Sequence, residues 1–432
     1  MTNNRELYNQ IQNPLDNDET LQLFLECYQQ NHGDIPYNYI VGATYMNQRL
    51  TLDWDKQSEL MAFLLNRSRA RGGIKNPYGI PTINYFIKTL PDPVPKDFFT
   101  RPEVLVNLRD VFAYSDSMDE LVVHPHVLKP WQGVGSSDHD EIHHRLYLNV
   151  KAEDEIDMAM KFVEKCDQKD LPIELKFFRL DSDRRDSFVI YVPGEELSSY
   201  IDVLREIKEE NPSLVAKVGE PPIFTGNIDG WIGYGSEKID SYESSSYHAE
   251  RLKVINDSIT NVLRSYVKEN LETQISNPDT NQTISVRDYF TKNLKNQVVE
   301  QKRRYINLDS KTSQEIDSAI EQSLEELLSD EFKEKSYQIE SMTFQLNRFH
   351  IRSAIADVIS KCDIDLSKFL PDIKKEIQAN AIIRGMDPDK ICFDVENRDL
   401  LFARDNSEKE LQAEDLPKVL IYSDKNNSSN QS

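Results

Sequence analysis

Cysteine is scarce in this sequence, and the cysteines present are scattered singly. They are Cys27, Cys166, Cys362 and Cys392, and no two of them have the CxxC spacing of a metal or redox motif. A disulfide framework is therefore excluded as the main source of stability, and the pattern is typical of a reducing cytosol. We expect a cytoplasmic protein that is held together by its hydrophobic core.

Long apolar runs are also missing. No stretch approaches the ~18 consecutive apolar residues that a membrane-spanning helix requires. The first residues, MTNNRELYNQIQ, contain neither the basic nor the apolar region of a Sec-type signal peptide. We expect no membrane anchor, whereas export by a specialised secretion system, whose signals are hard to recognise, stays open.

Positive charge is deficient. The chain has 51 Lys and Arg against 74 Asp and Glu, which gives a net charge of -23. Nucleic acids and anionic lipid surfaces are bound through clustered cations that replace counterions, so neither is expected as a partner. A neutral or basic peptide is electrostatically compatible with such a surface.

A chain of 432 residues is expected to form two or three domains, because single cores rarely exceed about 250–300 residues. The pattern predicts an α+β protein, in which a central mixed α/β sheet domain is flanked by mainly helical N- and C-terminal regions. The expected units are a mostly helical N-terminal region at 1–115, the sheet domain at 116–272, an acidic helical region at 285–420 and a disordered tail at 423–432.

Alternating polarity predicts strands in the middle of the chain, at 143–150, 173–180 and 187–192. A further strand is expected at 119–126. Because side chains of a strand point alternately to its two faces, the polar positions should lie on the face away from the core. The non-core positions of interest are Arg145, Tyr147, Lys176 and Tyr191.

Helical spacing of apolar residues predicts helices at 153–168, 196–209 and 246–270. A glycine-rich loop is expected at 219–240, and a loop of that length is usually functional. The segment 275–284 is expected to be a linker. Beyond it, helices are expected to dominate, with candidates that include 340–361 and 370–384.

Four runs in this middle segment carry a family resemblance: HRLYLNVKAEDEID, LPIELKFFRLDSDRRDSFVIYV, GEPPIFTGNIDGWIGYGSE and SYHAERL. Together they resemble the HopA-type type III effector family over about residues 143–262. That family includes plant-pathogen effectors and proteins of bacterial lanthipeptide and thioamitide biosynthesis. It is distantly similar to the phosphothreonine lyases of enteric pathogens.

The resemblance implies roles for individual residues. Lys176 stands at the position of the catalytic base that removes the Cα proton, and Tyr147 stands where the lyases have a histidine acid. The phosphate-binding positions correspond to Arg145, Arg185, Tyr191 and Arg251. Tyrosine titrates near 10, so delivery of a proton by Tyr147 is in question. His144 or His248 could substitute for it, or arginines alone could neutralise the leaving phosphate.

The implied chemistry is β-elimination of phosphate from phosphoserine or phosphothreonine, which gives a dehydroamino acid. A lysine can act as the base only when its amine is neutral, and nearby cations or burial favour that form. Arginines suit the phosphate because their planar fork matches its oxygens. Taken singly, each of these residues also has an ordinary structural explanation as an exposed strand residue or a turn ion pair.

No cofactor and no metal are expected. His124 and His126 would lie on one face of a strand, but no cysteine partner and no HExxH pattern accompanies them, which argues against a zinc site. The leading hypothesis is a lyase of a bacterial cytoplasm that acts on a phosphorylated peptide or protein, with a partner kinase to supply the phosphate. The alternative is a non-catalytic effector or scaffold module that binds a partner protein or precursor peptide.

Overall fold

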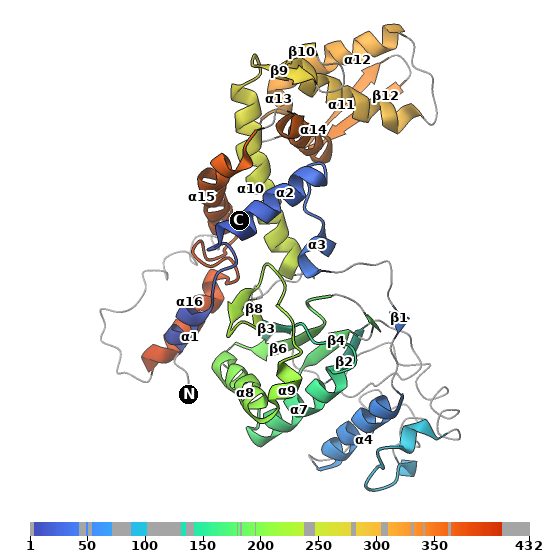
Figure 1. The fold of residues 1–432 in the computed structure, drawn as a ribbon, viewed down its shortest axis with the longest axis vertical. Coiled ribbons are helices and arrows are strands. Elements are labelled where there is room, and N and C mark those ends of the chain that lie inside the picture. Colours follow the sequence, from blue (N-terminus) through green and yellow to red (C-terminus); the bar gives the residue numbers. More distant parts are fainter. Residues whose placement is uncertain are drawn as a thin grey trace, which may run out of the picture.

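The computed structural model describes most of the chain. The described residues are 4–42, 49–50, 54–70, 88–101, 131–134, 142–178, 180–181, 184–194, 196–236, 247–277, 282–303, 310–329, 332–339, 342–361 and 364–407. They form two bodies, a sheet body and a mainly helical body, which the long helix α10 (Tyr247–Glu269) connects (Figure 1). The α+β class expected from the sequence is confirmed.

The sheet body is built on an antiparallel sheet. Its strands lie in the order β2-β4-β6-β3-β8-β7. Their bounds are β2 Trp131–Val134, β4 Leu175–Phe178, β6 Phe188–Pro193, β3 Ile142–Leu148, β8 Ile232–Ser236 and β7 Gly226–Ile228. The two strands β1 (Arg49–Leu50) and β5 (Leu180–Asp181) form a separate pair.

One face of this sheet is covered by α7 (Glu155–Gln168) and α8 (Leu197–Glu210), and α9 (Pro212–Val215) follows (Figure 1). Both longer helices are amphipathic, with buried residues at helical spacing such as Met158 and Phe162. They pack on the apolar positions of the strands, which confirms the predicted core alternation. The shared core includes Leu146, Leu148, Leu175, Phe177, Phe188 and Ile190.

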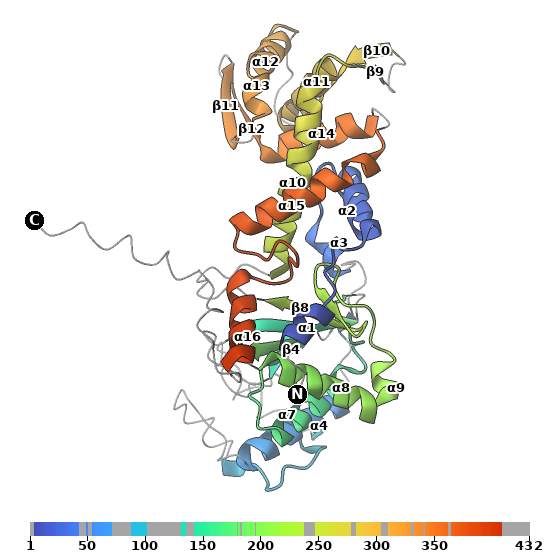
Figure 2. The same cartoon turned by 90° about the vertical axis from the view of Figure 1, so that its left-hand side faces the viewer.

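Segments from both ends of the chain complete the sheet body. α1 (Asn4–Gln10) lies beside α16 (Val395–Ser407), and the Asn4 amide donates to the Leu401 carbonyl at 3.2 Å (Figure 2). Cys392 lies in the same core as the sheet, and the Ser236 amide donates to its carbonyl at 2.9 Å. α4 (Trp54–Ala70) packs on α7, where Arg67 makes a bidentate ion pair with Asp167.

The helical body surrounds the second half of α10. Its helices are α2 (Asp18–Gln30), α3 (Tyr37–Val41), α11 (Val286–Arg303), α12 (Ser310–Gln322), α13 (Leu324–Leu327), α14 (Arg348–Lys361) and α15 (Leu370–Ile383). Two hairpins accompany them, β9 (Gln274–Asn277) with β10 (Gln282–Ser285), and β11 (Glu334–Ile339) with β12 (Met342–Asn347). One continuous core joins these elements.

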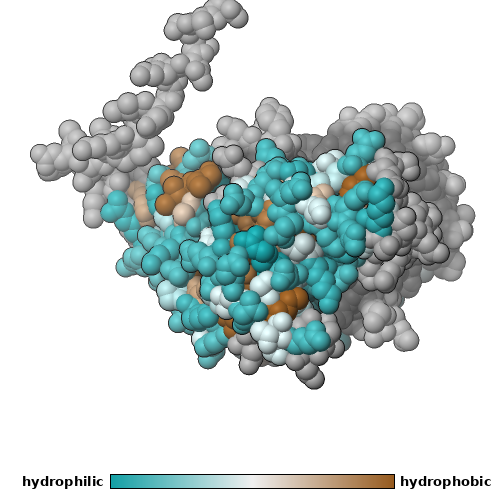
Figure 3. Space-filling view, turned by 90° about the horizontal axis from the view of Figure 1, so that it is seen from above, coloured by the Kyte–Doolittle hydropathy of each residue, from teal (hydrophilic) through white to brown (hydrophobic). Residues whose placement is uncertain are grey.

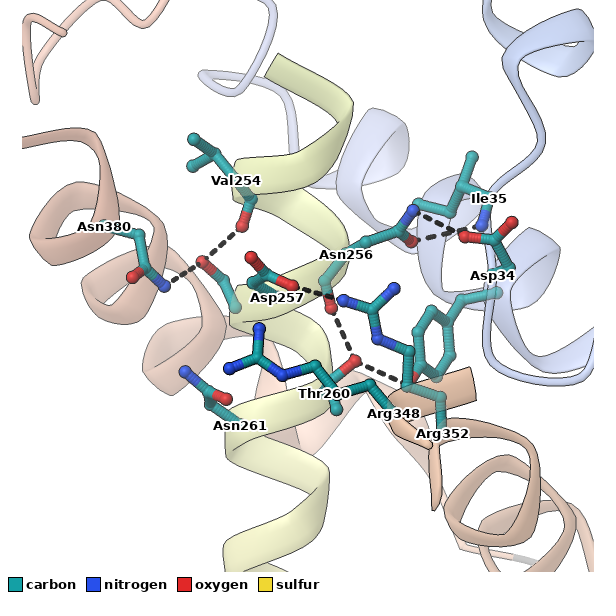
Figure 4. Close-up of polar contacts among 12 residues, drawn as sticks. Asp34, Ile35, Val254, Asn256, Asp257, Thr260, Asn261, Arg348, Arg352 and Asn380 are labelled. Atoms are coloured by element: carbon teal, nitrogen blue, oxygen red, sulfur yellow. Dashed lines mark hydrogen bonds and ion pairs between the residues drawn. The ribbon is translucent and has the colours of Figure 1, made fainter. Parts of the chain in front are cut away.

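Polar contacts fix the middle of α10 against its neighbours (Figure 4). Asn256 donates to Asp34 at 2.8 Å and accepts from the Ile35 amide at 3.1 Å, so the segment between α2 and α3 is bound to this helix. On other sides, Asp257 pairs with Arg352 of α14 and with Arg384 at the end of α15. These bonds tie the middle of α10 to the segment before α3, to α14 and to the end of α15.

Three predictions of local structure were wrong. The glycine-rich loop expected at 219–240 contains β7 and β8. Glycines are needed in β8 because a Cβ at Gly235 would collide with the Tyr247 ring. The linker expected at 275–284 supplies both strands of the β9–β10 hairpin. The helix expected at 340–361 begins as strand β12 and becomes helical only at Arg348. The strand predicted at 119–126 and the tail at 423–432 lie outside the described residues.

Among the described helices, none combines the length and the apolar character needed to cross a membrane.

Candidate functional site

The face of the sheet away from α7 and α8 carries a row of three residues from three strands. Tyr147 of β3 and Lys176 of β4 both lie directly opposite Val189 of β6. Residues opposite one another in neighbouring strands point to the same face. The register therefore brings Lys176 and Tyr147, which are 29 positions apart in the sequence numbering, to one surface of the sheet.

The next row on this face consists of Arg145 and Tyr191, which are also cross-strand partners. Two cations lie over the Tyr191 ring: its centroid is 5.0 Å from Cζ of Arg145 and 5.3 Å from Nζ of Lys176. A cation over an aromatic face is stabilised by the ring quadrupole. All three residues are partly exposed.

The start of α10 forms the opposite wall of this site. Tyr147 packs against the rings of Tyr247 and His248, with centroid distances of 5.8 Å and 5.0 Å. Tyr247 can approach the sheet because Gly235 lies beneath it, where a Cβ atom would come within 2.5 Å of the ring. Gly235 is the cross-strand neighbour of Arg145, so the absence of a side chain at this glycine lets the start of α10 pack on the sheet beside Arg145.

His248 is enclosed at the centre of these groups. Its residue surface is 2% exposed, and within the described part of the chain its Nε2 atom makes no hydrogen bond. Burial lowers the pKa of His248 to about 3, and four positive charges add to the effect: Arg145, Arg184, Arg251 and Lys176. The imidazole is therefore neutral at physiological pH, and the surroundings are strongly cationic.

The two neighbouring arginines before β6 have different surroundings. Arg184 is buried, donates to Asp186 at 2.8 Å and acts electrostatically on His248. Arg185 is partly exposed and forms an ion pair with Glu220 at 3.6 Å. The structure thus places Arg184 beside the site. Sequence reasoning selected Arg185 and missed Arg184, although both belong to the same Arg-Arg-Asp run.

Residues 131–280 match the HopA1 effector protein family. The match is less than half of the 432-residue chain, and it contains the whole sheet, the start of α10 and every cation named above. The resemblance inferred from the sequence is confirmed for this segment. No curated protein matches the chain.

Arg251, which also lies in the HopA1-matched segment, has its guanidinium group occupied by protein partners. It is 1% exposed and donates to the Asp394 carboxylate at 3.1 Å, to the Ile391 carbonyl at 3.1 Å and to the Ser236 carbonyl at 3.3 Å. A buried arginine with three such acceptors holds the C-terminal segment against the sheet. Its charge reaches His248, but its hydrogen bonds are directed elsewhere.

His144 points to the opposite side of the HopA1-matched sheet. Its two ring nitrogens lie 2.9 Å from the Tyr234 hydroxyl and 3.1 Å from the Gly194 carbonyl. Leu146, two residues further along β3, points to the same face of the sheet and lies in the core. Of the two histidines considered as substitutes for the acid, only His248 lies beside Tyr147.

One further residue comes from outside the matched segment. The Tyr37 ring of α3 contacts His248 edge-on, with centroids 6.2 Å apart. The Val41 carbonyl at the end of this helix accepts from the Arg185 amide at 2.7 Å. No sequence signal pointed to Tyr37, because its contact joins residues 211 positions apart through the docking of α3 on α10.

The site is suited to an anion. Its groups are a primary amine, guanidinium groups, phenols and a neutral imidazole, all of which can donate hydrogen bonds to an anion. In the described part of the chain, no cluster of three or more His, Cys, Asp or Glu side chains could hold a metal ion. His124 and His126 lie outside the described residues.

Proposed function

We propose that this protein is a lyase that eliminates phosphate from phosphoserine or phosphothreonine in a peptide. The observation that carries the proposal is the placement of Lys176 beside Arg145 and Tyr191 on one partly exposed sheet face. An amine that can accept a proton thus stands next to groups that can hold a phosphate.

The phosphate is bound by the cations of the site. Arg145 presents a guanidinium group on the exposed side of β3, and Arg184 adds a second positive charge near His248. Guanidinium groups bind phosphate oxygens through paired, charge-assisted hydrogen bonds. The tyrosine Tyr191 orients both Arg145 and Lys176 through its ring.

Lys176 removes the proton from Cα of the phosphorylated residue. The reactive form for this step is the neutral amine, which like charges such as Arg145 favour. The electron pair of the Cα–H bond forms the Cα=Cβ double bond, and the Cβ–O bond breaks. The phosphate leaves with the bridging oxygen and takes up one proton, and the peptide keeps a dehydroamino acid.

A separate enzyme supplies the substrate. Elimination needs a phosphate that is already attached to serine or threonine, so a kinase acts first on the same peptide. An acidic protein with a cationic site attracts the phosphate locally, while its net charge of -23 favours a neutral or basic peptide around it. Dehydroamino acids are intermediates in peptide natural-product modification, which is the setting we propose.

Mass spectrometry of phosphopeptides incubated with the full-length protein tests the proposal. A phosphoserine and a phosphothreonine peptide are used, and a small thiol is added afterwards. Elimination leaves a double bond that adds the thiol, whereas hydrolysis leaves serine or threonine, which does not. Loss of phosphoric acid followed by thiol addition is expected, and dephosphorylation without thiol addition would overturn the proposal.

A second candidate is a binding module, an effector or scaffold that engages a protein or precursor peptide. It is favoured by two adjacent exposed residues of α15, Ile382 (61% exposed) and Ile383 (80% exposed), in a helix that the family match does not reach. Seen from the end of the helical body, the surface is mainly hydrophilic with a few separate hydrophobic patches (Figure 3). Phosphopeptides that return unchanged from every incubation would support this candidate over the lyase.

A further inference from the structure

His248 is a buried titratable group that the elimination steps above do not use. It is the second residue of α10, it is 2% exposed, and its Nε2 atom makes no hydrogen bond to any described residue. A buried polar atom without a partner costs free energy, so such atoms are rare in proteins. The position of this one, inside the cationic site, indicates that a ligand supplies the partner.

The groups that face His248 come from every element around it. The sheet contributes Arg145 and Tyr147 from β3 and Lys176 from β4, and the turn before β6 contributes Arg184. The walls contribute Tyr247 and Arg251 from α10 and Tyr37 from α3. Two of these arginines are paired with carboxylates, Arg184 with Asp186 and Arg251 with Asp394.

We propose that His248 is an anion-linked proton site, which takes up a proton when a phosphate group binds among these cations. The inference rests on the proposed function because it uses the same phosphate site. In the empty site, four like charges oppose the imidazolium form. A bound dianion offsets part of this positive charge and accepts a hydrogen bond from the newly protonated ring.

The coupling is reciprocal, because anion and proton each stabilise the form that binds the other. The start of α10 adds to it, since the positive end of the helix dipole disfavours a cation at His248 and favours an anion beside it. The site therefore binds a dianion together with a proton, and the affinity for the dianion rises as the pH falls.

This proton has a use in the proposed reaction. When the Cβ–O bond breaks, the departing phosphate needs one proton to leave as the hydrogen phosphate dianion. Protonated His248 gives that proton to the phosphate oxygen and returns to its neutral form. The lyase-type histidine is thus replaced by one from a different element, while Tyr147 at the motif position packs against its ring at 5.0 Å.

Calorimetry with inorganic sulfate tests the inference without any enzymatic turnover. Sulfate is a dianion at every pH used and takes up no proton itself, so any proton uptake belongs to the protein. Titration of the full-length protein at pH 6 in two buffers with different ionisation enthalpies gives the number of protons taken up per sulfate. Roughly one proton is expected for the wild type, and uptake should vanish at high pH.

Two variants make the assignment specific. His248→Gln keeps an N–H group near the Nε2 position but does not titrate, so sulfate binding should persist within about tenfold while proton uptake is lost. His32→Gln, the same change at an exposed histidine, should behave as the wild type. Uptake that survives in His248→Gln, or binding without uptake in the wild type, would overturn the inference and leave the lyase proposal standing. Absence of sulfate binding would overturn both.

Discussion

Lys176 and Tyr147 lie opposite the same residue, Val189, one on each side of strand β6. Neighbouring strands are ~4.8 Å apart, so the two Cα atoms are about 10 Å apart across the sheet with side chains on one face. The proposed base and the residue at the lyase acid position therefore border the same patch. Tyr191 and Arg145 lie in the adjacent row and are the residues that we propose to bind the phosphate.

The first prediction separates the two residues that could protonate the leaving phosphate. Tyr147→Phe should keep the elimination rate within about tenfold, because its hydroxyl is not the donor in this account. His248→Gln should lower the rate by about a hundredfold, which is typical of losing a general acid. Initial rates with one phosphopeptide measure both. A larger loss in Tyr147→Phe than in His248→Gln would make the phenol the donor.

Arg184 and Arg185 form a natural matched pair for a second prediction. Arg184→Gln is combined with Asp186→Asn so that no buried carboxylate is left without a partner. This double variant should weaken sulfate binding about 10- to 100-fold, because a charge-assisted contact contributes roughly 1.5–3 kcal/mol. Arg185→Gln should change affinity little, since its partner is the exposed Glu220. Calorimetry on both variants decides the question. Equal losses would show that the two arginines share the role.

The third prediction concerns Arg251, which the family resemblance places with the phosphate. Asp394→Ala should lower the free energy of unfolding by about 3–5 kcal/mol, because it leaves the buried Arg251 charge without its carboxylate. Asp399→Ala, in the same C-terminal segment but paired at the surface, is the control. Urea unfolding measures both. Unchanged stability in Asp394→Ala would mean that Arg251 is free to serve the site. A truncation near Asn270 should also unfold the sheet body, because it removes Asp394 and leaves the buried Arg251 without its carboxylate.

The fourth prediction is a pH dependence of stability. The pKa of His248 is lowered to about 3 in the folded protein, against 6.5 in the unfolded chain, so the unfolded state binds the extra proton. The free energy of unfolding should therefore be unaffected above pH 6.5 and should fall by at most about 1.4 kcal/mol per pH unit as the pH drops from 6.5 toward 3. His248→Gln removes this contribution. Parallel wild-type and variant curves between pH 6.5 and 4 would contradict it.

Sequence reasoning was most successful where one periodicity governs a whole element. The alternation in β3 placed Arg145 and Tyr147 opposite the core, and helical spacing at 246–270 located α10 within a residue at each end. It failed where small residues hide a strand. The glycines of β8 suggested a loop, yet Gly235 is needed there because Tyr247 packs directly on it.

The site itself was only partly predictable. Cross-strand register determines which polar positions meet, and no local pattern encodes it, so the common partner Val189 emerged only from the structure. The choice between Arg184 and Arg185 depends on the turn conformation. The burial of Arg251 depends on Asp394, which lies 143 residues further along the chain.

The most direct test of the account is the elimination rate of the Lys176→Ala variant. Wild type, Lys176→Ala and the control Lys253→Ala, an exposed lysine of α10, are incubated with the same phosphopeptide and followed by mass spectrometry. Circular dichroism confirms that all three are folded. The account predicts that Lys176→Ala loses about 10²–10⁴-fold in rate while Lys253→Ala is unchanged. Full activity in folded Lys176→Ala would contradict the assignment of the base and, with it, the proposed site.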